Sequence, residues 1–205
     1  MKTYFEKTVF HDELKVKLTR LVNRPNCMPK FTILYGEPGT GKTSFAKEFA
    51  TEFSSVPVYF PVNETGLGTS IFEEIEKHTT SGILFADETK QFDKIIVVDE
   101  FHNANKNQQD KFKTLFDELG DHCRFIFILN TNSRVRGKQI HDLISPAMYS
   151  RMVRISFDVP ERLVDEVVEK SLYLYPDLPE SIIRATLPDH RQLAIKQQMA
   201  ELEVV

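Results

Sequence analysis

Between residues 10 and 157 the chain alternates between two hydrophobic patterns. Short runs of almost continuous apolar residues, which are typical of buried strands, occur at 31–35, 56–62, 94–99, 124–130 and 152–157. Stretches with helical spacing occur at 10–22, 41–53, 70–78 and 107–119. Strands that alternate with helices indicate an α/β fold, with a five-stranded parallel sheet covered by helices on both faces.

The pattern changes after Pro160, where helical spacing continues without further strands. Three helices are expected at 161–173, 179–187 and 189–202. We therefore predict two parts, an α/β core over residues 1–159 and a small helical unit over residues 160–205.

Composition is that of an ordinary globular protein. Hydrophobic residues make up 41% and charged residues 27% of the 205 residues, so a core can form. The formal net charge of −4 differs from the basic excess that dedicated nucleic-acid-binding proteins usually show. No apolar run approaches membrane-spanning length, the N-terminus has no signal-peptide pattern, and the two cysteines suggest no disulfide framework. We expect a soluble, cytoplasmic protein without a membrane partner.

A phosphate-binding motif follows the first predicted strand. Residues 36–43 read G-E-P-G-T-G-K-T, the full G-x-x-x-x-G-K-T pattern, in the strand-to-helix context that argues against a chance match. The glycines let backbone N–H groups curl around phosphates, Lys42 would reach the β and γ phosphates, and the Thr43 hydroxyl would hold Mg²⁺. The residues expected to bind ATP here are Gly36, Glu37, Pro38, Gly39, Thr40, Gly41, Lys42, Thr43 and Ser44.

Three further polar residues end predicted strands, at the edge where parallel sheets bind ligands. Asp99 and Glu100 end the third strand, and we expect Asp99 to support Mg²⁺ and Glu100 to polarise the attacking water. Asn130 ends the fourth strand, where its amide could hydrogen-bond the γ-phosphate and the water together. Solvated turn residues are the alternative reading, and Asn130 begins a run of turn-forming residues.

With these residues in place, the chain resembles an AAA+ ATPase, and most of all the small ATPase subunit of a DNA-polymerase clamp loader. The approach to the phosphate loop from Met28, the V-N-E segment at 62–64, and the spacing from Asp99 to Asn130 are similar to that family. The Asp-Glu-Phe form at 99–101 is similar to phage-type members. The resemblance extends over about residues 10–202 and implies an AAA+ core, a helical lid over 160–205, and ATP with Mg²⁺ between them.

The resemblance also implies roles for two arginines. Ser150 and Arg151 resemble the segment that carries the arginine finger, so Arg151 would reach the ATP of a neighbouring AAA+ subunit. The segment 188–191 resembles the start of the lid helix, so Arg191 would contact phosphate in its own subunit. Solvated surface arginines are the alternative. An active site shared between subunits of a homo- or hetero-oligomer is therefore expected.

Some features depart from the family pattern. The stretch 133–141 is longer than usual and carries a basic loop that could follow a DNA backbone or simply be solvated. The helix expected at 70–78 has three glutamates where the family tends to have positive charge. The chain ends at Val205 without the family's collar domain. Three explanations stay open: a fragment, a compact viral relative, or a different assembly. The basic residues of the loop are Arg134, Arg136 and Lys138.

The function implied by the resemblance is an ATP-driven switch in DNA replication, which loads a sliding clamp onto primer–template DNA. A different AAA+ machine such as a helicase loader, and an adaptor that binds ATP without hydrolysing it, are the alternatives. The intact Glu100 and Arg151 argue against the adaptor. The histidines, including His102, have no metal-ligand spacing, so ordinary surface or core roles are expected for them.

Overall fold

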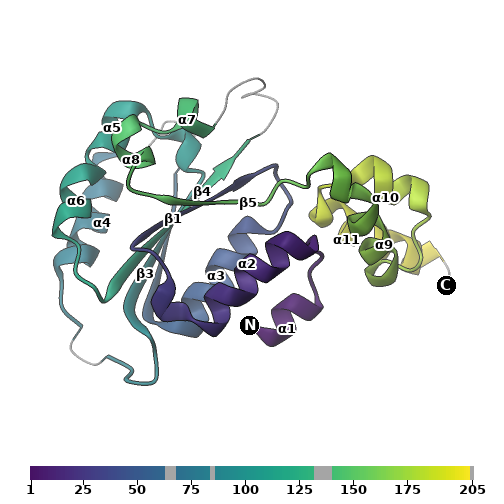
Figure 1. The fold of residues 1–205 in the computed structure, drawn as a ribbon, viewed down its shortest axis with the longest axis horizontal. Helices are drawn as coiled ribbons and strands as arrows, with labels where there is room; N and C mark the ends of the chain where they lie inside the picture. Colours follow the sequence, from purple (N-terminus) through teal and green to yellow (C-terminus); the bar gives the residue numbers. More distant parts are fainter. Residues whose placement is uncertain (63–67, 84–85, 132–139, 204–205) are drawn as a thin grey trace.

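The computed structural model describes residues 1–62, 68–83, 86–131 and 140–203. A five-stranded parallel sheet forms its centre, in the strand order β2-β3-β4-β1-β5 (Figure 1). The strands are β1 (Phe31–Gly36), β2 (Ser54–Pro61), β3 (Phe92–Asp99), β4 (Cys123–Asn130) and β5 (Val153–Ser156). Each strand lies within two residues of its predicted bounds, and the predicted sheet is confirmed.

Side chains of the central strands alternate between the two faces of the sheet, as the two-residue period of a strand requires. On β4, Phe125 and Phe127 belong to one hydrophobic cluster, whereas Ile126 and Ile128 belong to the other. Because helices cover both faces, these strands have continuous apolar sequences rather than an alternation of apolar and polar residues.

Helices α2 (Asp12–Asn23) and α3 (Lys42–Phe53) cover one face of the sheet. Helix α3 buries Phe45, Ala46, Phe49 and Ala50, whose spacing forms the apolar stripe of an amphipathic helix. A short α1 (Lys2–Glu6), which the sequence pattern did not predict, adds partly buried side chains to the same cluster.

The other face is covered by α4 (Thr69–Thr80), α5 (Lys106–Asp110), α6 (Phe112–Glu118), α7 (Ile140–Leu143) and α8 (Pro146–Tyr149). The prediction of one helix over 107–119 was wrong in this detail, because two short helices occupy that range. The buried Gln109 side chain donates to the carbonyl oxygens of Ala104 (2.8 Å) and Leu143 (2.9 Å). The contact with Leu143 joins α5 to the segment that precedes α8.

Three helices follow β5 and gather at one end of the molecule in Figure 1. They are α9 (Val164–Leu174), α10 (Glu180–Thr186) and α11 (His190–Glu203), close to the ranges predicted for the lid. They pack around a small apolar cluster of their own, which includes Val168, Ile183 and Leu193. The division of the chain at residues 159 and 160 stays a prediction.

Salt bridges join α9 and the turn before it to α2. The Arg162 guanidinium donates to both carboxylate oxygens of Glu13, at 2.8 and 3.0 Å. Lys170 Nζ lies 2.6 Å from carboxylate oxygens of both Asp12 and Glu166. These contacts hold the helical lid against the N-terminal end of α2, beside the phosphate loop.

Candidate nucleotide-binding and hydrolysis site

The phosphate loop connects the end of β1 to the start of α3. Gly39 and Gly41 have φ values of 80° and 90°, which are accessible to glycine but strained for other residues. A Cβ atom on Gly39 would also lie 2.1 Å from Asp189 Oδ1 and 2.8 Å from Asp189 Cα. The loop therefore needs glycine at this position both for its turn and for its contact with the lid.

Lys42 lies inside the loop, with only 3% of its surface exposed. Its Nζ donates to the carbonyl oxygens of Gly36 (2.9 Å) and Glu37 (2.5 Å) and to Thr40 Oγ1 (3.2 Å). Burial lowers the pKa of Lys42 to about 8, although carboxylates nearby oppose this shift. The Lys42 ammonium group is poorly solvated and is surrounded by the backbone of the phosphate loop. Such a group is suited to bind a phosphate anion.

The Thr43 hydroxyl and the Asp99 carboxylate are in direct contact at the start of α3. The Thr43 hydroxyl donates to Asp99 Oδ2 at 2.9 Å, the Tyr59 hydroxyl donates to the same oxygen, and the Glu100 amide donates to Asp99 Oδ1 at 2.8 Å. Within the described residues, no group of three His, Cys, Asp or Glu side chains could hold a metal ion. Paired hydroxyl and carboxylate oxygens nevertheless fit Mg²⁺, which usually takes few protein ligands and completes its shell with phosphates and water.

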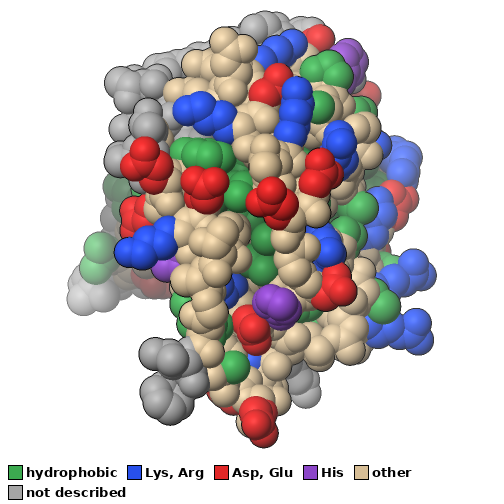
Figure 2. All heavy atoms as spheres, turned by 90° about the vertical axis from the view of Figure 1, so that its left-hand side faces the viewer, with side chains coloured by type: hydrophobic (Ala, Val, Ile, Leu, Met, Phe, Trp, Pro, Cys, Tyr) green, Lys and Arg blue, Asp and Glu red, His purple; other side chains and the backbone are tan. Residues whose placement is uncertain are grey.

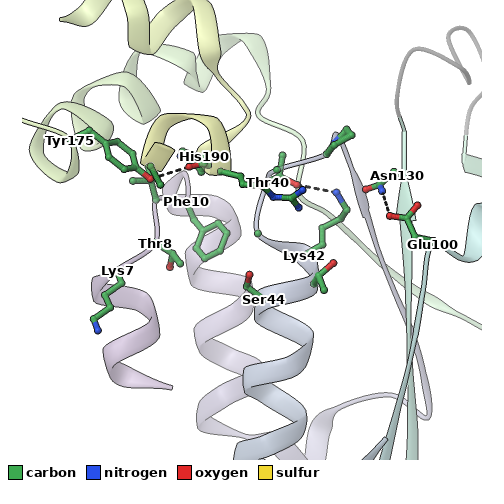
Figure 3. Close-up of a pocket in the computed structure, with 17 residues that line it drawn as sticks. Lys7, Thr8, Phe10, Thr40, Lys42, Ser44, Glu100, Asn130, Tyr175 and His190 are labelled. Atoms are coloured by element: carbon green, nitrogen blue, oxygen red, sulfur yellow. Dashed lines mark hydrogen bonds between the residues drawn. The ribbon is translucent and has the colours of Figure 1, made fainter. Parts of the chain in front are cut away.

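Glu100 and Asn130 meet because β4 lies next to β3, and β4 also pairs with β1 on its other side. The strand register pairs Gly36 with Asn130, so the end of β4 lies beside the start of the phosphate loop. Asn130 Nδ2 donates to Glu100 Oε1 at 2.8 Å (Figure 3). Glu100 has a φ of 55°, an uncommon backbone conformation for a residue with a side chain, and such conformations concentrate at functional sites.

Glu100 has a second neighbour that the sequence pattern did not reveal. His102 Nε2 lies 3.2 Å from Glu100 Oε2, and His102 Nδ1 accepts a hydrogen bond from the Asn130 backbone amide at 3.3 Å. His102 thus contacts the carboxylate of Glu100, and the expectation of an ordinary surface or core role for it stays a prediction. The contact of His102 with Asn130 depends on where β3 and β4 end relative to each other, which the spacing of residues along the chain does not show.

A cavity of about 440 Å³ lies between the phosphate loop, the N-terminal segment and the lid (Figure 3). The side of it opposite Lys42 and Glu100 is formed by Phe10, Tyr175 and His190, which sequence analysis missed. The lining residues are Lys7, Thr8, Val9, Phe10, Pro38, Gly39, Thr40, Gly41, Lys42, Thr43, Ser44, Glu100, Asn130, Tyr175, His190, Arg191 and Ala194. The cavity brings apolar and aromatic side chains together with phosphate-loop polar groups, as ligand sites commonly do.

The first turn of α11 contacts the phosphate loop directly. The His190 amide donates to the Gly39 carbonyl oxygen at 3.2 Å, and Arg191 follows it into the lining of the cavity. Burial lowers the pKa of His190 to about 4, so its ring is neutral at pH 7. The structure thus brings Arg191 to the same cavity as Lys42, Glu100 and Asn130.

Of the predicted residues that lie in the described part of the chain, Gly36, Glu37, Asp99 and Arg151 do not line this cavity. At the start of the loop, the Glu37 amide donates to Asp158 Oδ1 at 2.8 Å. Arg151 lies between α8 and β5, with Nε 3.9 Å from Asp117 Oδ1 and with 43% of its side chain exposed. Arg151 therefore does not contribute to the cavity of its own chain.

The structure adds little to the nucleic-acid hypothesis. Arg134, Arg136 and Lys138 lie outside the described residues. On the face that carries α4 and α6, acidic and basic side chains are interspersed (Figure 2). Glu73, Glu74 and Glu76 are exposed on α4. None of the helices in the described part of the chain is long and apolar enough to cross a membrane.

Comparison with known proteins identifies relatives over most of the chain. Replication factor C small subunit 2 of Pyrobaculum islandicum is 27% identical over 96% of this chain and 60% of its own length. Replication factor C subunit 3 of Schizosaccharomyces pombe is 24% identical over 91% of this chain and 54% of its own length. The chain thus spans little more than half the length of these relatives.

Structural comparison supports the same fold. A DNA polymerase III gamma subunit-related protein from Thermotoga maritima has a TM-score of 0.54 at 13% identity, over 88% of this chain and 57% of that one. The model of the family described as "ATPase family associated with various cellular activities (AAA)" matches residues 32–159, more than half of the chain. The predicted resemblance to AAA+ ATPases and to clamp-loader small subunits is thereby confirmed. The chain belongs to the AAA family of ATPases.

Proposed function

We propose that this protein binds ATP in the cavity between the phosphate loop and the lid and hydrolyses it. The observation that carries the proposal is the convergence of Lys42, Glu100, Asn130 and Arg191 on one cavity, from segments far apart in the sequence. A nucleotide-binding loop alone would support binding. A carboxylate and an amide in contact beside that loop are in addition suited to orient a water molecule for attack.

Each residue has a role that its position favours. Lys42 and the loop amides bind the phosphates, and Arg191 adds a second cation from the lid. Thr43 and Asp99 would hold Mg²⁺, which neutralises charge on the phosphate oxygens when bound. Glu100 accepts a proton from the attacking water, and Asn130 orients Glu100 and the γ-phosphate. The adenine base of the nucleotide lies toward Phe10 and Tyr175.

Arg151 acts, in this proposal, on the ATP of a neighbouring subunit. Arg151 is not among the residues that line its own cavity, its side chain is 43% exposed, and its contacts are a hydrogen bond to the Ala147 carbonyl oxygen (3.1 Å) and a salt bridge of 3.9 Å to Asp117. An exposed guanidinium with such contacts can turn toward a neighbouring subunit. An arginine supplied by a partner stabilises charge that develops on the transferred phosphoryl group. The active unit would then be an oligomer of AAA+ subunits rather than a single chain.

At the level of the cell, we propose a role in DNA replication like that of a clamp-loader ATPase subunit. Similarity to replication factor C small subunits over most of the chain supports this assignment. The partners would be a sliding clamp and primer–template DNA. Stimulation of ATP turnover by primed DNA together with a clamp is expected, and stimulation by a replicative helicase without a clamp would instead favour a helicase loader.

The variant Glu100→Gln separates ATP binding from hydrolysis. It keeps the size of the side chain but removes the carboxylate, so ATP with Mg²⁺ should bind as in wild type while turnover decreases about 10²-fold or more. Calorimetry measures the binding and phosphate release measures the turnover. Wild-type turnover in this variant would show that another group activates the water. Absence of turnover in the wild type, even with neighbouring subunits and DNA present, would favour the ATP-binding adaptor.

A further inference from the structure

Three side chains and one backbone amide form a closed ring at the ends of β3 and β4. The Asn130 side chain donates to Glu100 Oε1 at 2.8 Å, and His102 Nε2 lies 3.2 Å from Glu100 Oε2. The Asn130 backbone amide completes the ring by donating to His102 Nδ1 at 3.3 Å. Both oxygens of the carboxylate are thus contacted by residues that are themselves hydrogen-bonded to each other.

Glu100 needs such contacts to keep a single orientation. Its side chain is 43% exposed and extends from a backbone with a φ of 55° at the very end of β3. A long exposed side chain otherwise samples several rotamers, and small displacements of a catalytic group reduce rates strongly.

His102 is held firmly enough to supply one of these contacts. Its side chain is only 14% exposed, and the residues on either side of it are anchored. Phe101 is fully buried with its ring centroid 4.6 Å from that of Phe127, and Asn103 Nδ2 donates to the Val62 carbonyl oxygen at 3.1 Å. The imidazole is therefore fixed relative to β2 and β4.

The chemistry of the imidazole determines which of its nitrogens carries the proton. Because Nδ1 accepts the Asn130 amide hydrogen, a neutral ring must carry its own proton on Nε2, the atom that faces Glu100. Burial lowers the pKa of His102, against the opposing effect of the Glu100 and Asp99 carboxylates, which favours this neutral form.

We propose that His102 is a positioning residue for hydrolysis, which orients the Glu100 carboxylate through its Nε2–H while its Nδ1 is fixed by the end of β4. The inference rests on the proposed ATPase function and adds to it a residue that touches neither ATP nor the attacking water. His102 acts on turnover through Glu100, so it affects the rate of hydrolysis and not the binding of ATP.

Three substitutions at this position distinguish the two nitrogen contacts. His102→Ala removes both, and kcat should decrease about 10- to 100-fold while the Kd for ATP stays within about twofold. His102→Gln keeps an N–H donor near the place of Nε2 and should recover most of kcat. His102→Asn keeps an acceptor near the place of Nδ1 but is too short to reach Glu100, so it should resemble the alanine variant. Thermal melting of each variant checks that the fold is retained.

The opposite ranking would overturn the proposal. If His102→Asn hydrolyses ATP like the wild type and His102→Gln does not, the histidine only supports the end of β4. Unchanged kcat in His102→Ala, in a preparation whose wild type turns over ATP, also contradicts it and leaves the proposed ATPase function intact. A wild type without turnover under every condition removes the proposed function itself, and this inference with it.

A second comparison tests whether the effect passes through Glu100. In single-turnover assays, His102→Ala should cause no further decrease when Glu100 is already replaced by alanine. If His102→Ala lowers the single-turnover rate by the same factor in the wild type and in Glu100→Ala, His102 does not act through Glu100. Independently of activity, NMR of protein with 15N-labelled histidine should detect the His102 Nε2–H proton protected from exchange in the wild type. In Glu100→Ala the protection should be lost, and protection that persists would contradict the contact.

Discussion

Lys42 donates to three oxygen atoms of the loop that contains it, so its ammonium group has no unused hydrogen when nucleotide is absent. Phosphate oxygens must replace at least some of these acceptors when ATP binds. The exchange is favourable because charged phosphate oxygens are stronger acceptors than neutral carbonyl oxygens.

Lys42→Ala should therefore weaken ATP binding. A charge-assisted hydrogen bond contributes on the order of 1.5–3 kcal/mol, which corresponds to a roughly 10- to 100-fold increase in Kd. Lys17→Ala, which removes an exposed lysine from α2, is the matched control for loss of one positive charge. Equal ATP affinity of wild type and Lys42→Ala in calorimetric titration would contradict the assignment.

The lowered pKa of Lys42 predicts that ATP binding near pH 8 takes up protons. At that pH the free protein holds the amine about half protonated, whereas bound phosphates stabilise the charged form. Uptake of roughly half a proton per ATP is expected, and ATP affinity should decrease as pH rises above 8. Calorimetry at pH 8 in two buffers of different ionisation enthalpy measures the uptake.

Lys42→Arg is the control for this titration, because a guanidinium group stays charged at this pH. The uptake should disappear in this variant. Equal uptake by Lys42→Arg and wild type would assign the protons to another group.

At the scale of elements, the phosphate loop before α3 and the first turn of α11 are in direct contact. Gly39 has no room for a Cβ atom against Asp189, and its carbonyl oxygen accepts from the His190 amide. The nucleotide cavity therefore has its present shape only while α11 stays docked on the loop. Salt bridges from Arg162 and Lys170 to α2 support the same docking.

The neutral, partly buried His190 makes this docked state sensitive to acid. Its pKa is about 4 in the folded protein and 6.5 when unperturbed, so between these values the unfolded chain binds a proton that the folded chain does not. Stability should therefore decrease as pH falls from 6.5 toward 4. In His190→Gln this decrease should be smaller, as measured by denaturant midpoints at a series of pH values.

His141→Gln provides the comparison, because His141 has 59% of its side chain exposed, outside the cavity. This variant should follow the wild-type pH dependence. If His190→Gln also follows it, the ring of His190 does not contribute to the acid sensitivity.

At the scale of the whole molecule, Arg151 is exposed and is not among the residues that line the nucleotide cavity of its own chain. A shared active site follows if a second subunit brings its Arg151 to this cavity. Arginine fingers contribute about 10³–10⁵ in rate, so a dilute monomer should bind ATP but hydrolyse it very slowly. Turnover should then rise more steeply than linearly with protein concentration, because association completes the site.

Mixing two inactive variants tests the shared site. Arg151→Ala keeps an intact cavity and Lys42→Ala keeps an intact arginine, so an interface between the two variants can contain one complete site. Part of the activity should return on mixing, with co-assembly verified by sedimentation. No recovery in a mixture that does co-assemble would argue that Arg151 acts within its own chain or not at all.

The order of the elements and the phosphate loop could be predicted from local patterns. Strand positions follow from short apolar runs, and the loop follows from a motif whose glycines are needed for backbone conformation at Gly39 and Gly41. The break at Lys111 was not predicted in this way, since the apolar spacing over 107–119 continues across it.

The cavity itself could be predicted only in part. Asp99, Glu100 and Asn130 were found because parallel strands end at a common edge, a rule that needs no knowledge of strand order. Phe10, Tyr175 and His190 carried no signal, because they come from the two ends of the chain and meet only when the lid docks. Tyr59 was missed for the same kind of reason, since its contact with Asp99 requires β2 to pair with β3.

The sequence by itself therefore determined the class of fold, the phosphate loop and the acidic strand end, because each depends on residues within a few positions of one another. Only the tertiary structure decided that β4 lies between β3 and β1, which brings Asn130 next to Gly36 on one side and next to Glu100 and His102 on the other. Strand order and register arise from the packing of the whole sheet, and a local hydrophobic period contains no information about them. For that reason the chemistry of single residues could be read along the chain, whereas their cooperation in one site required the folded molecule.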